Sequence, residues 1–363
     1  MKLALLGCGA LSELYYSPAL REVGLVENLQ VSALIDPNPS RLDVLARSFP
    51  KARRLASMTD LSRGEVDLAI VASPPKFHSE QTIALLRLGI HVLCEKPMAS
   101  SVAEAWAMVD TASKAGRLLS VGLFRRFFPS SQFVHDLITG GALGRPVSFR
   151  WMEGGPFNWP ATSASFFQKA ASPGGVFGDI GPHVLDLLLF WFGEPCSIDY
   201  EDDAVGGLEA NARLDLAFEN GVTGTLRLSR DTAIPNGTRI YFERGSVWFQ
   251  GASADSVVVQ LDGCSHVAKA TLHAPPRADS SLDAGSGTPG LTYAQSFMEQ
   301  IRNVYRAIRG EEPLRVPAEQ AVRSLGLIER CYASRRLMPM PWLTEAEREG
   351  AMRLTDGAPH PAL

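Results

Sequence analysis

Along the first 121 residues, short apolar runs alternate with longer stretches that have helical periodicity. This alternation is typical of βαβ units, which build parallel sheets. Most of the runs are apolar at nearly every position, as expected when helices cover both faces of a sheet. The pattern therefore predicts a doubly wound, Rossmann-like α/β domain over residues 1–123. Its predicted strands are 3–6, 31–35, 67–71, 91–93 and 118–121, and its clearest helices are 81–88 and 102–115.

Beyond residue 125, predicted strands follow one another without intervening helices. This predicts an α+β domain over residues 124–343 with a large, mostly antiparallel open sheet. Asn220 and Gly221 indicate a hairpin turn. The segment 275–289, rich in Ser, Asp, Gly and Pro, is expected to be a surface loop, and residues 344–363 a loosely held C-terminal tail. The strands are predicted at 147–153, 213–218, 222–229, 239–243 and 246–250, and the helices at 131–138, 182–192, 293–308 and 318–334.

Composition narrows the function classes. A chain of 363 residues is long enough for two domains, and its 45% hydrophobic content is that of a globular protein. A net charge of −4 without a basic stripe argues against nucleic-acid binding. No apolar run is long enough to span a membrane or to serve as a signal peptide. The five cysteines form no Cys-x-x-Cys pair, so we expect no metal site and a reducing, cytoplasmic location.

A glycine-rich turn directly after the first strand is the first chemical signal. Its glycines, Gly7 and Gly9, would let a pyrophosphate approach the N-terminus of the next helix. Ser12 stands at the third glycine position of the usual motif, and a turn of this kind alone can also be purely structural. The residues of this turn expected to contact a dinucleotide are Gly7, Gly9, Ala10 and Leu11.

Asp36 follows the second predicted strand, at the position from which a carboxylate binds the adenosine ribose. Its charge would repel a 2′-phosphate, so the sequence favours NAD over NADP. Arg41 or Ser40 could still accommodate that phosphate, so NADP remains possible. Because Asp36 precedes Pro37, it could also be an ordinary turn-forming residue.

Two further segments end predicted strands at the carboxyl edge of the sheet, where ligands bind in open α/β folds. Ser73 and Pro74 end one of them, and His78 follows either as part of this edge or as a surface residue at a helix start. Glu95 and Lys96 end the other. The Lys96 ammonium could stabilise an alkoxide or share a proton relay, or it could be a solvated strand-end lysine. The sequence does not decide whether the Lys96–Pro97 peptide is cis or trans.

A glycine-rich segment before the predicted helix 182–192 carries a carboxylate and an imidazole. Pro182 suits the first turn of this helix, which would place Asp179 near the helix start and His183 in the first turn. Histidine can take the hydroxyl proton when an alcohol is oxidised, and Asp179 could orient its imidazole. Alternatively, Asp179 is a helix cap and His183 a core residue.

Possible substrate contacts lie early in the second domain. Arg126 begins it, close to the expected cleft. Aromatic rings and an amide suit a sugar ring, although the same residues could be core or loop anchors. These residues are Trp151, Phe157, Asn158 and Trp159.

Together, these segments resemble the glucose-fructose oxidoreductase, inositol dehydrogenase and rhizopine-catabolism (Gfo/Idh/MocA) dehydrogenases. The resemblance covers most of the chain. It rests on the turn from Gly7 to Ser12, on Asp36, on Ser73-Pro74 with His78, on Glu95-Lys96-Pro97, on the segment from Gly122 to Arg126, and on Gly174-Gly175 with Asp179, His183 and Asp186.

This resemblance implies hydride transfer between a nicotinamide cofactor and a sugar, sugar derivative or cyclitol. It also implies dimers or tetramers formed through the open sheet. It assigns catalytic roles to Lys96, Asp179 and His183, which with Arg126 and Trp159 make the expected substrate site. The expected cofactor site adds Asp36, Arg41, Ser73, Pro74, His78, Glu95 and Lys96 to the glycine-rich turn.

Two other classes of function remain open on the same scaffold. One is an NAD-dependent glycoside hydrolase that oxidises its substrate transiently, and the other is a non-catalytic sugar sensor or regulator. Net reduction of nicotinamide would distinguish the dehydrogenase from the hydrolase. An intact set of Lys96, Asp179 and His183 argues against the sensor.

Overall fold

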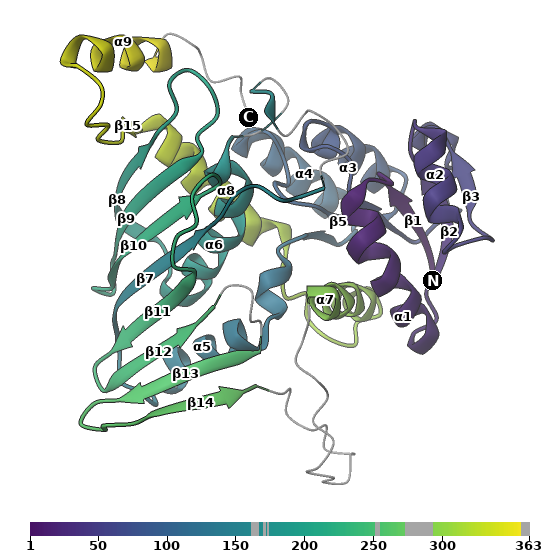
Figure 1. The fold of residues 1–363 in the computed structure, drawn as a ribbon. Coiled ribbons are helices and arrows are strands. Elements are labelled where there is room, and N and C mark those ends of the chain that lie inside the picture. The colour runs from purple at the N-terminus through teal and green to yellow at the C-terminus, as the bar shows by residue number, and fades with distance from the viewer. Residues whose placement is uncertain (161–166, 170–171, 173, 251–254, 273–292, 357–363) are drawn as a thin grey trace.

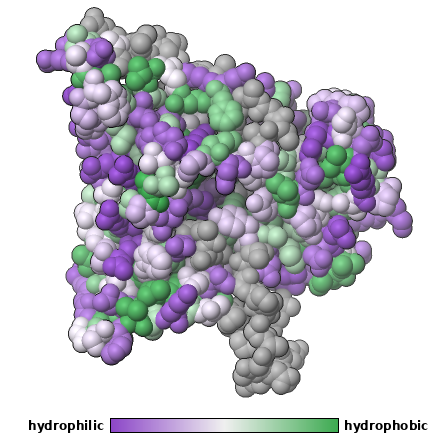
Figure 2. Space-filling view, viewed as in Figure 1, coloured by the Kyte–Doolittle hydropathy of each residue, from purple (hydrophilic) through white to green (hydrophobic). Residues whose placement is uncertain are grey.

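The computed structural model describes residues 1–160, 167–169, 172, 174–250, 255–272 and 293–356 (Figure 1). Within these residues, the chain forms a six-stranded and a nine-stranded sheet on opposite sides of the molecule, with helices between them. The predicted loop 275–289 lies outside the described residues. None of the helices in the described part of the chain is long and apolar enough to cross a membrane. Hydrophilic and hydrophobic residues are interspersed on the face seen in Figure 2.

The N-terminal sheet is parallel throughout, which confirms the predicted Rossmann-like fold. Its order is β3-β2-β1-β4-β5-β6, so the direction of winding reverses between β1 and β4, where ligands bind in such sheets. Strand β3, a three-residue edge strand, was not among the strands predicted from the sequence. The strands are β1 (Lys2–Leu6), β2 (Gln30–Ile35), β3 (Arg53–Leu55), β4 (Leu68–Val71), β5 (His91–Cys94) and β6 (Leu119–Val121), and the helices are α1 (Ser17–Val26), α2 (Pro39–Ala46), α3 (His78–Arg87) and α4 (Val102–Ala115).

The second sheet has the order β14-β13-β12-β11-β7-β10-β9-β8-β15. It is mostly antiparallel, as predicted, with parallel pairing of β10 with β7 and of β15 with β8. The predicted hairpin joins β9 and β10, where Gly221 has φ +87° and the Asn220 side chain accepts a hydrogen bond from Val222 N. The strands are β7 (Pro146–Gly154), β8 (Pro195–Asp202), β9 (Asn211–Phe218), β10 (Thr223–Ser229), β11 (Gly237–Phe242), β12 (Gly245–Phe249), β13 (Ser256–Leu261), β14 (Val267–Thr271) and β15 (Arg336–Leu337).

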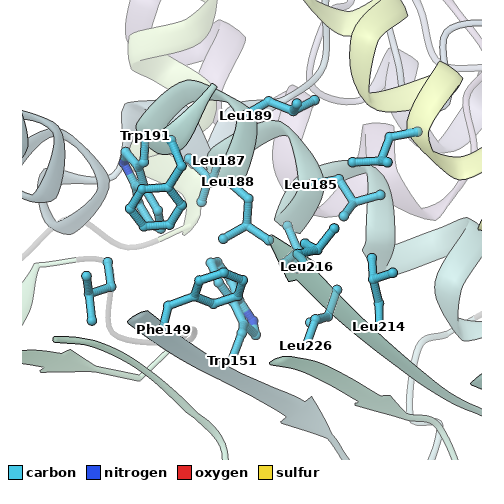
Figure 3. Packing of buried hydrophobic residues seen from close by; sticks show 14 of the residues in the cluster. Phe149, Trp151, Leu185, Leu187, Leu188, Leu189, Trp191, Leu214, Leu216 and Leu226 are labelled. Carbon is cyan, nitrogen blue, oxygen red and sulfur yellow. The ribbon is translucent and has the colours of Figure 1, made fainter. Parts of the chain in front are cut away.

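One face of this sheet packs on helices α5 (Pro129–Gly140), α6 (Val176–Phe192) and α8 (Ala318–Ala333). Along β7, Phe149 and Trp151 are buried while Arg150 between them is exposed, so alternate residues face the core. Figure 3 shows Phe149 and Trp151 facing the leucines of α6. Each large apolar side chain buried in this way contributes roughly 1.5–3 kcal/mol. No helix in the described residues covers the outer face.

Helices late in the chain also pack on the Rossmann half. Helix α7 (Tyr293–Ile308) packs against α1, and its Phe297 and Ile301 join the core around Leu3 and Leu5 of β1. Helix α8 contacts α6 on one side and α4 on the other. The two halves are therefore connected by these helices as well as by the chain crossing near residue 124. The domain division at residues 123 and 124 stays a prediction.

Helix α6 begins at Val176, so the predicted start at Pro182 is wrong. Pro182 lies inside the helix and Asp179 lies in its first turn. The cause is a non-local cap: Glu209 accepts hydrogen bonds from Val176 N through its backbone oxygen and from Phe177 N through its carboxylate, both at 3.0 Å. These contacts satisfy backbone donors that a helix start leaves free.

Within the predicted loose tail, residues 345–356 form helix α9 (Glu345–Asp356), and the expectation that this tail is loosely held stays a prediction. Thr344 and Glu347 form a reciprocal cap at its start, since each side chain accepts a hydrogen bond from the other residue's backbone N–H. In Figure 1, α9 projects away from the sheet beyond β15. Residues 357–363 lie outside the described part.

Candidate active site

The glycine-rich turn has the shape that a dinucleotide requires. Gly7 has φ +87°, and a Cβ at this position would lie 2.5 Å from the Ala72 carbonyl, so only glycine fits where this turn meets the end of β4. A Cβ on Gly9 would meet nothing within 4 Å, which leaves open space beside the turn. The hydroxyl of Ser12, at the third motif position, donates to Gly7 O. These features fit the approach of a pyrophosphate.

Asp36 and Arg41 both bind the same turn. The Asp36 carboxylate accepts hydrogen bonds at 2.8 Å from Cys8 N and from Asn38 N. The Arg41 guanidinium donates to Cys8 O at 2.7 Å and to Glu13 at 2.7 Å. Asp36 therefore stabilises the local turn at Pro37, which was one of the two roles predicted for it. It also lies at the carboxyl end of β2, beside the open space at Gly9, where the other predicted role, binding of a ribose, is possible.

His78 is buried at 1% exposure, so the alternative of a surface histidine is wrong. Its Nδ1 lies 2.8 Å from Pro97 O and its Nε2 lies 2.7 Å from Ser73 O. Burial is the main cause that lowers its pKa. The ring therefore joins the loop after β4 to the loop that follows Lys96. Of the predicted edge residues, Ser73 and His78 line the central cavity, whereas Pro74 is exposed beside it.

Glu95 is buried directly before Lys96. Its carboxylate accepts a hydrogen bond from Tyr16 OH at 2.6 Å and from Lys96 N at 3.0 Å, while burial raises its pKa. A Cβ on Gly122 would lie 2.7 Å from this carboxylate, so glycine is required there. The Lys96–Pro97 peptide is cis. These contacts fix the backbone from which the Lys96 side chain enters the cavity.

A carboxylate between two cations lies at the centre of the site. Lys96 Nζ donates to Asp179 Oδ1 at 2.7 Å and to Asp179 O at 2.9 Å, and Arg230 Nη2 donates to Asp179 Oδ2 at 2.8 Å. Burial acts to raise the pKa of Asp179, but Lys96 and Arg230 more than offset it, so this pKa is lowered. Asp179 is thus held ionised, and Lys96 is aimed by two oxygens.

His183 lies at the same cavity, 5% exposed, with its ring edge-on to Phe124 at 4.8 Å between centroids. Burial, followed by the nearby charges of Lys96 and Arg125, lowers its pKa well below the ordinary value. Its Nδ1 has no hydrogen-bond partner among the described residues. The carboxylate of Asp179 binds Lys96 and Arg230, and no hydrogen bond joins it to His183 within the described part of the structure. The interpretation that Asp179 orients the imidazole therefore finds no contact to support it.

Of the two neighbouring arginines, Arg125 lies at the cavity and Arg126 does not. Arg125 lines the cavity and forms a two-pronged ion pair with Glu153, at 2.7 and 2.6 Å. Arg126 is 4% exposed and forms a two-pronged ion pair with Asp186 beneath helix α6. The sequence predicts Arg126 as a substrate contact, and the structure does not support this, because Arg126 is held by Asp186 and the neighbouring Arg125 lines the cavity.

The cavity has a volume of about 320 Å³ and two unlike sides. The polar side presents Lys96, Arg125, Asp179 and His183. The other side is aromatic, and within it the Tyr15 ring stacks on Trp159 at 6.1 Å and on Phe297 at 5.2 Å between centroids. Its ring-bearing residues are Tyr15, Phe124, Trp159, Tyr293 and Phe297. Of these, only Trp159 is among the substrate contacts that the sequence predicts.

A parallel sheet with a glycine-rich turn that opens onto a cavity lined by Lys96, Asp179 and His183 is the arrangement expected of a nicotinamide-dependent oxidoreductase. Residues 1–123 match the model of the oxidoreductase family with an NAD-binding Rossmann fold, and residues 131–248 match the GFO/IDH/MocA C-terminal domain. The chain belongs to the GFO/IDH/MocA oxidoreductase family.

Individual relatives are distant. The rhizopine catabolism protein MocA of Rhizobium meliloti is 26% identical over 90% of this chain and 93% of its own length. D-glucoside 3-dehydrogenase of Escherichia coli is 31% identical over 46% of this chain, and the chain spans only 48% of that relative. The solved structure of levoglucosan dehydrogenase with NADH and levoglucosan matches 92% of this chain and 96% of its own, with a TM-score of 0.79 at 20% identity, which supports the fold.

Proposed function

We propose that this protein transfers a hydride between a nicotinamide dinucleotide and a secondary alcohol or ketone of a sugar, sugar derivative or cyclitol. The observation that carries the proposal is the convergence of Lys96, Asp179 and His183 on one cavity at the carboxyl edge of the Rossmann sheet. Rhizobium MocA, the inositol dehydrogenase of Thermotoga maritima and the glucoside dehydrogenase of Escherichia coli are named for rhizopine, cyclitol and sugar chemistry, which supports this substrate class.

The residues of the cavity can perform the proton transfer that accompanies the hydride transfer. A bound nicotinamide ring supplies the hydride acceptor or donor. His183 is neutral near neutral pH because its pKa is lowered, so it can take the proton of a substrate hydroxyl as general base. The Lys96 ammonium, held by Asp179 at 2.7 Å, supplies positive charge for the alkoxide that develops on the same oxygen.

The aromatic side of the cavity supports binding of a ring. Sugars and cyclitols have faces of C–H groups, and these pack well against rings such as Trp159 and Tyr15. The hydroxyls would then face Lys96, Arg125 and His183. We assign Trp159 to substrate binding on this basis, and leave Arg126 to the structural ion pair with Asp186.

The cofactor preference, the assembly and the location belong to the same proposal. The Asp36 carboxylate beside the open turn favours NAD, because it would repel the 2′-phosphate of NADP. The outer face of the nine-stranded sheet, which no helix in the described residues covers, is the surface proposed to form a homodimer or homotetramer. All five cysteines are free, which supports a reducing location such as the cytoplasm.

A binding and turnover experiment tests the proposal. NADH and NADPH binding would be followed by fluorescence, and nicotinamide absorbance would then be measured with free sugars, methyl glycosides and inositols. We expect NADH to bind more tightly than NADPH and at least one polyol to reduce NAD. Net reduction excludes the hydrolase alternative, whereas protein that binds neither dinucleotide contradicts the proposal.

The role of the lysine is tested with Lys96→Met, which removes the ammonium but keeps a side chain of similar length. Turnover should fall about 10²–10⁴-fold, while the dissociation constant for NADH changes little. Near-normal turnover by this variant on the best substrate would remove Lys96 from the mechanism.

A further inference from the structure

Arg230 is an arginine at the active site that the sequence did not single out. It follows β10 directly, and its side chain is only 12% exposed. Its guanidinium donates to Asp179 Oδ2 at 2.8 Å, while Lys96 donates to the other oxygen, Oδ1, at 2.7 Å. The two oxygens of one carboxylate are therefore divided between the two cations.

The turn after β10 fixes the backbone of Arg230. Arg230 N donates to Ala210 O at 2.8 Å, which continues the pairing with the strand next to it. Asp231 accepts hydrogen bonds from Asn211 at 3.1 Å and from the hydroxyl of Thr232 at 2.9 Å. With its own N–H and the neighbouring Asp231 held, Arg230 has a fixed backbone position from which its side chain reaches Asp179.

The guanidinium also lies over the ring of Phe157, at 5.3 Å from its centroid. Phe157 precedes the cavity residue Trp159 by two positions. Arg230 thus contacts the segment that supplies the aromatic side of the cavity and the aspartate that aims the lysine. An arginine can do both because its planar fork donates from its edge while its face stacks.

The charged groups around Asp179 come from five elements. Lys96 follows β5, Arg125 lies in the turn Phe124–Phe127, Glu153 lies on β7, Arg230 follows β10, and His183 shares helix α6 with Asp179. Arg125 is paired with Glu153 and lowers the pKa of Asp179 less than Lys96 and Arg230 do, and these two cations are the ones that bind the carboxylate oxygens. Removing Arg230 leaves Lys96 to hold Asp179 alone.

We infer that Arg230 is a positioning residue for the proposed hydride transfer: by holding Asp179 Oδ2, it keeps the carboxylate turned so that Oδ1 aims the Lys96 ammonium at the substrate oxygen. The inference rests on the proposed function and adds a residue to it. Arg230 acts through Asp179 and needs no contact with substrate.

The test compares Arg230→Met, Arg230→Lys and Arg336→Met on the best polyol substrate with NAD. Arg336 forms an exposed ion pair with Asp199 at the far edge of the sheet and serves as the matched control. Arg230→Met should lower kcat about 10- to 100-fold with little change in the KM for NAD. Arg230→Lys should recover most of this loss, and Arg336→Met should behave as the parent protein.

Two readouts separate positioning from a purely structural role. Without Arg230 the pKa of Asp179 rises, so its protonation should add to that of His183: the acid limb of the kcat profile should begin at higher pH and become steeper in Arg230→Met, and return in Arg230→Lys. In an Asp179→Asn background, Arg230→Met should cost little further activity, because its partner is already gone. An unmoved acid limb, or an equal loss in both backgrounds, overturns the inference.

Poor folding of Arg230→Met would not leave the question open, because Arg230→Lys and Arg230→Gln keep a polar group at this partly buried position. Both would be checked by circular dichroism and NADH fluorescence before kinetics. If Arg230→Gln is folded and fully active, Arg230 has no positioning role. If the parent protein reduces no nicotinamide with any polyol, the proposed function fails instead.

Discussion

At the scale of single residues, the charges that surround Asp179 and His183 determine the protonation state of each. Asp179 stays ionised between Lys96 and Arg230 although burial opposes it, while His183 stays neutral because burial and the nearby cations Lys96 and Arg125 both disfavour its charged form. A general base must be unprotonated, which suits the neutral His183 to the proposed role of base. An ionised Asp179 suits the proposed role of Lys96, because it holds the charged ammonium in place.

The lowered pKa of His183 predicts the pH dependence of alcohol oxidation. A base with the ordinary histidine pKa of about 6.5 would lose activity as pH falls through that value. Since the pKa of His183 is well below this, the neutral base persists and kcat/KM should stay level through about pH 6.5, falling only in more acidic solution.

Initial rates of NADH formation from about pH 5 to about pH 9 provide the measurement. The control is His183→Asn, which should lose most activity at every pH. An acid limb centred near the ordinary histidine pKa would show that His183 is not the neutral base described here.

Helix α6 shows how one element brings several parts of the site together. It carries Asp179 and His183 toward the cavity and Asp186 toward Arg126, while its leucines pack on β7 and β9. Its start depends on Glu209, whose carboxylate accepts hydrogen bonds from Phe177 N at 3.0 Å and from Tyr332 OH at 2.8 Å. The register of the helix, and so the place of Asp179 and His183, which are proposed to be catalytic, depends on this remote contact.

Replacing this acceptor should therefore destabilise the protein. Glu209→Ala removes the carboxylate that accepts hydrogen bonds from Phe177 N and from Tyr332 OH, and losing the acceptor of a buried donor costs about 1–3 kcal/mol. We expect the free energy of unfolding to fall by about 2–5 kcal/mol, measured by urea denaturation. Glu209→Gln keeps an acceptor oxygen and should lose clearly less. Equal stability of Glu209→Ala and the parent would contradict the capping role.

At the scale of the whole molecule, the late helices hold the two sheets together. Helix α7 completes the core of the Rossmann sheet, and helix α8 packs between α4 and α6. Glu329 on α8 also accepts a hydrogen bond from Val102 N, at the start of α4, at 2.7 Å. The late helices therefore pack on both halves of the molecule, and α7 also lines the cavity through Tyr293 and Phe297.

Cysteine reactivity reports on this packing. Cys8, Cys94 and Cys331 are buried, and burial is the main cause that raises the pKa of Cys8 and of Cys331 to about 12. Cys196 and Cys264 are exposed. A disulfide reagent should therefore modify Cys196 and Cys264 quickly in the native protein and the buried thiols only after denaturation, because thiolates react and buried thiols do not ionise.

The release of chromophore against time measures this reactivity. A double variant, Cys196→Ser with Cys264→Ser, should show no fast phase. Fast reaction of a third thiol in the native parent protein would show that the packed helices open more readily than the structure implies.

The sequence by itself determined the elements and residues whose signals are local. The apolar runs gave the parallel strands, and the Gly7 turn, Lys96 and His183 stood out because each has a characteristic neighbourhood within a few positions of the chain. Tertiary structure alone decided which groups meet. Arg230 and Asp179 are far apart in sequence, Glu209 sets the start of α6 from another loop, and Arg125 rather than Arg126 faces the cavity. Side-chain pairing of this kind depends on the packing of whole elements, which no short stretch of sequence contains.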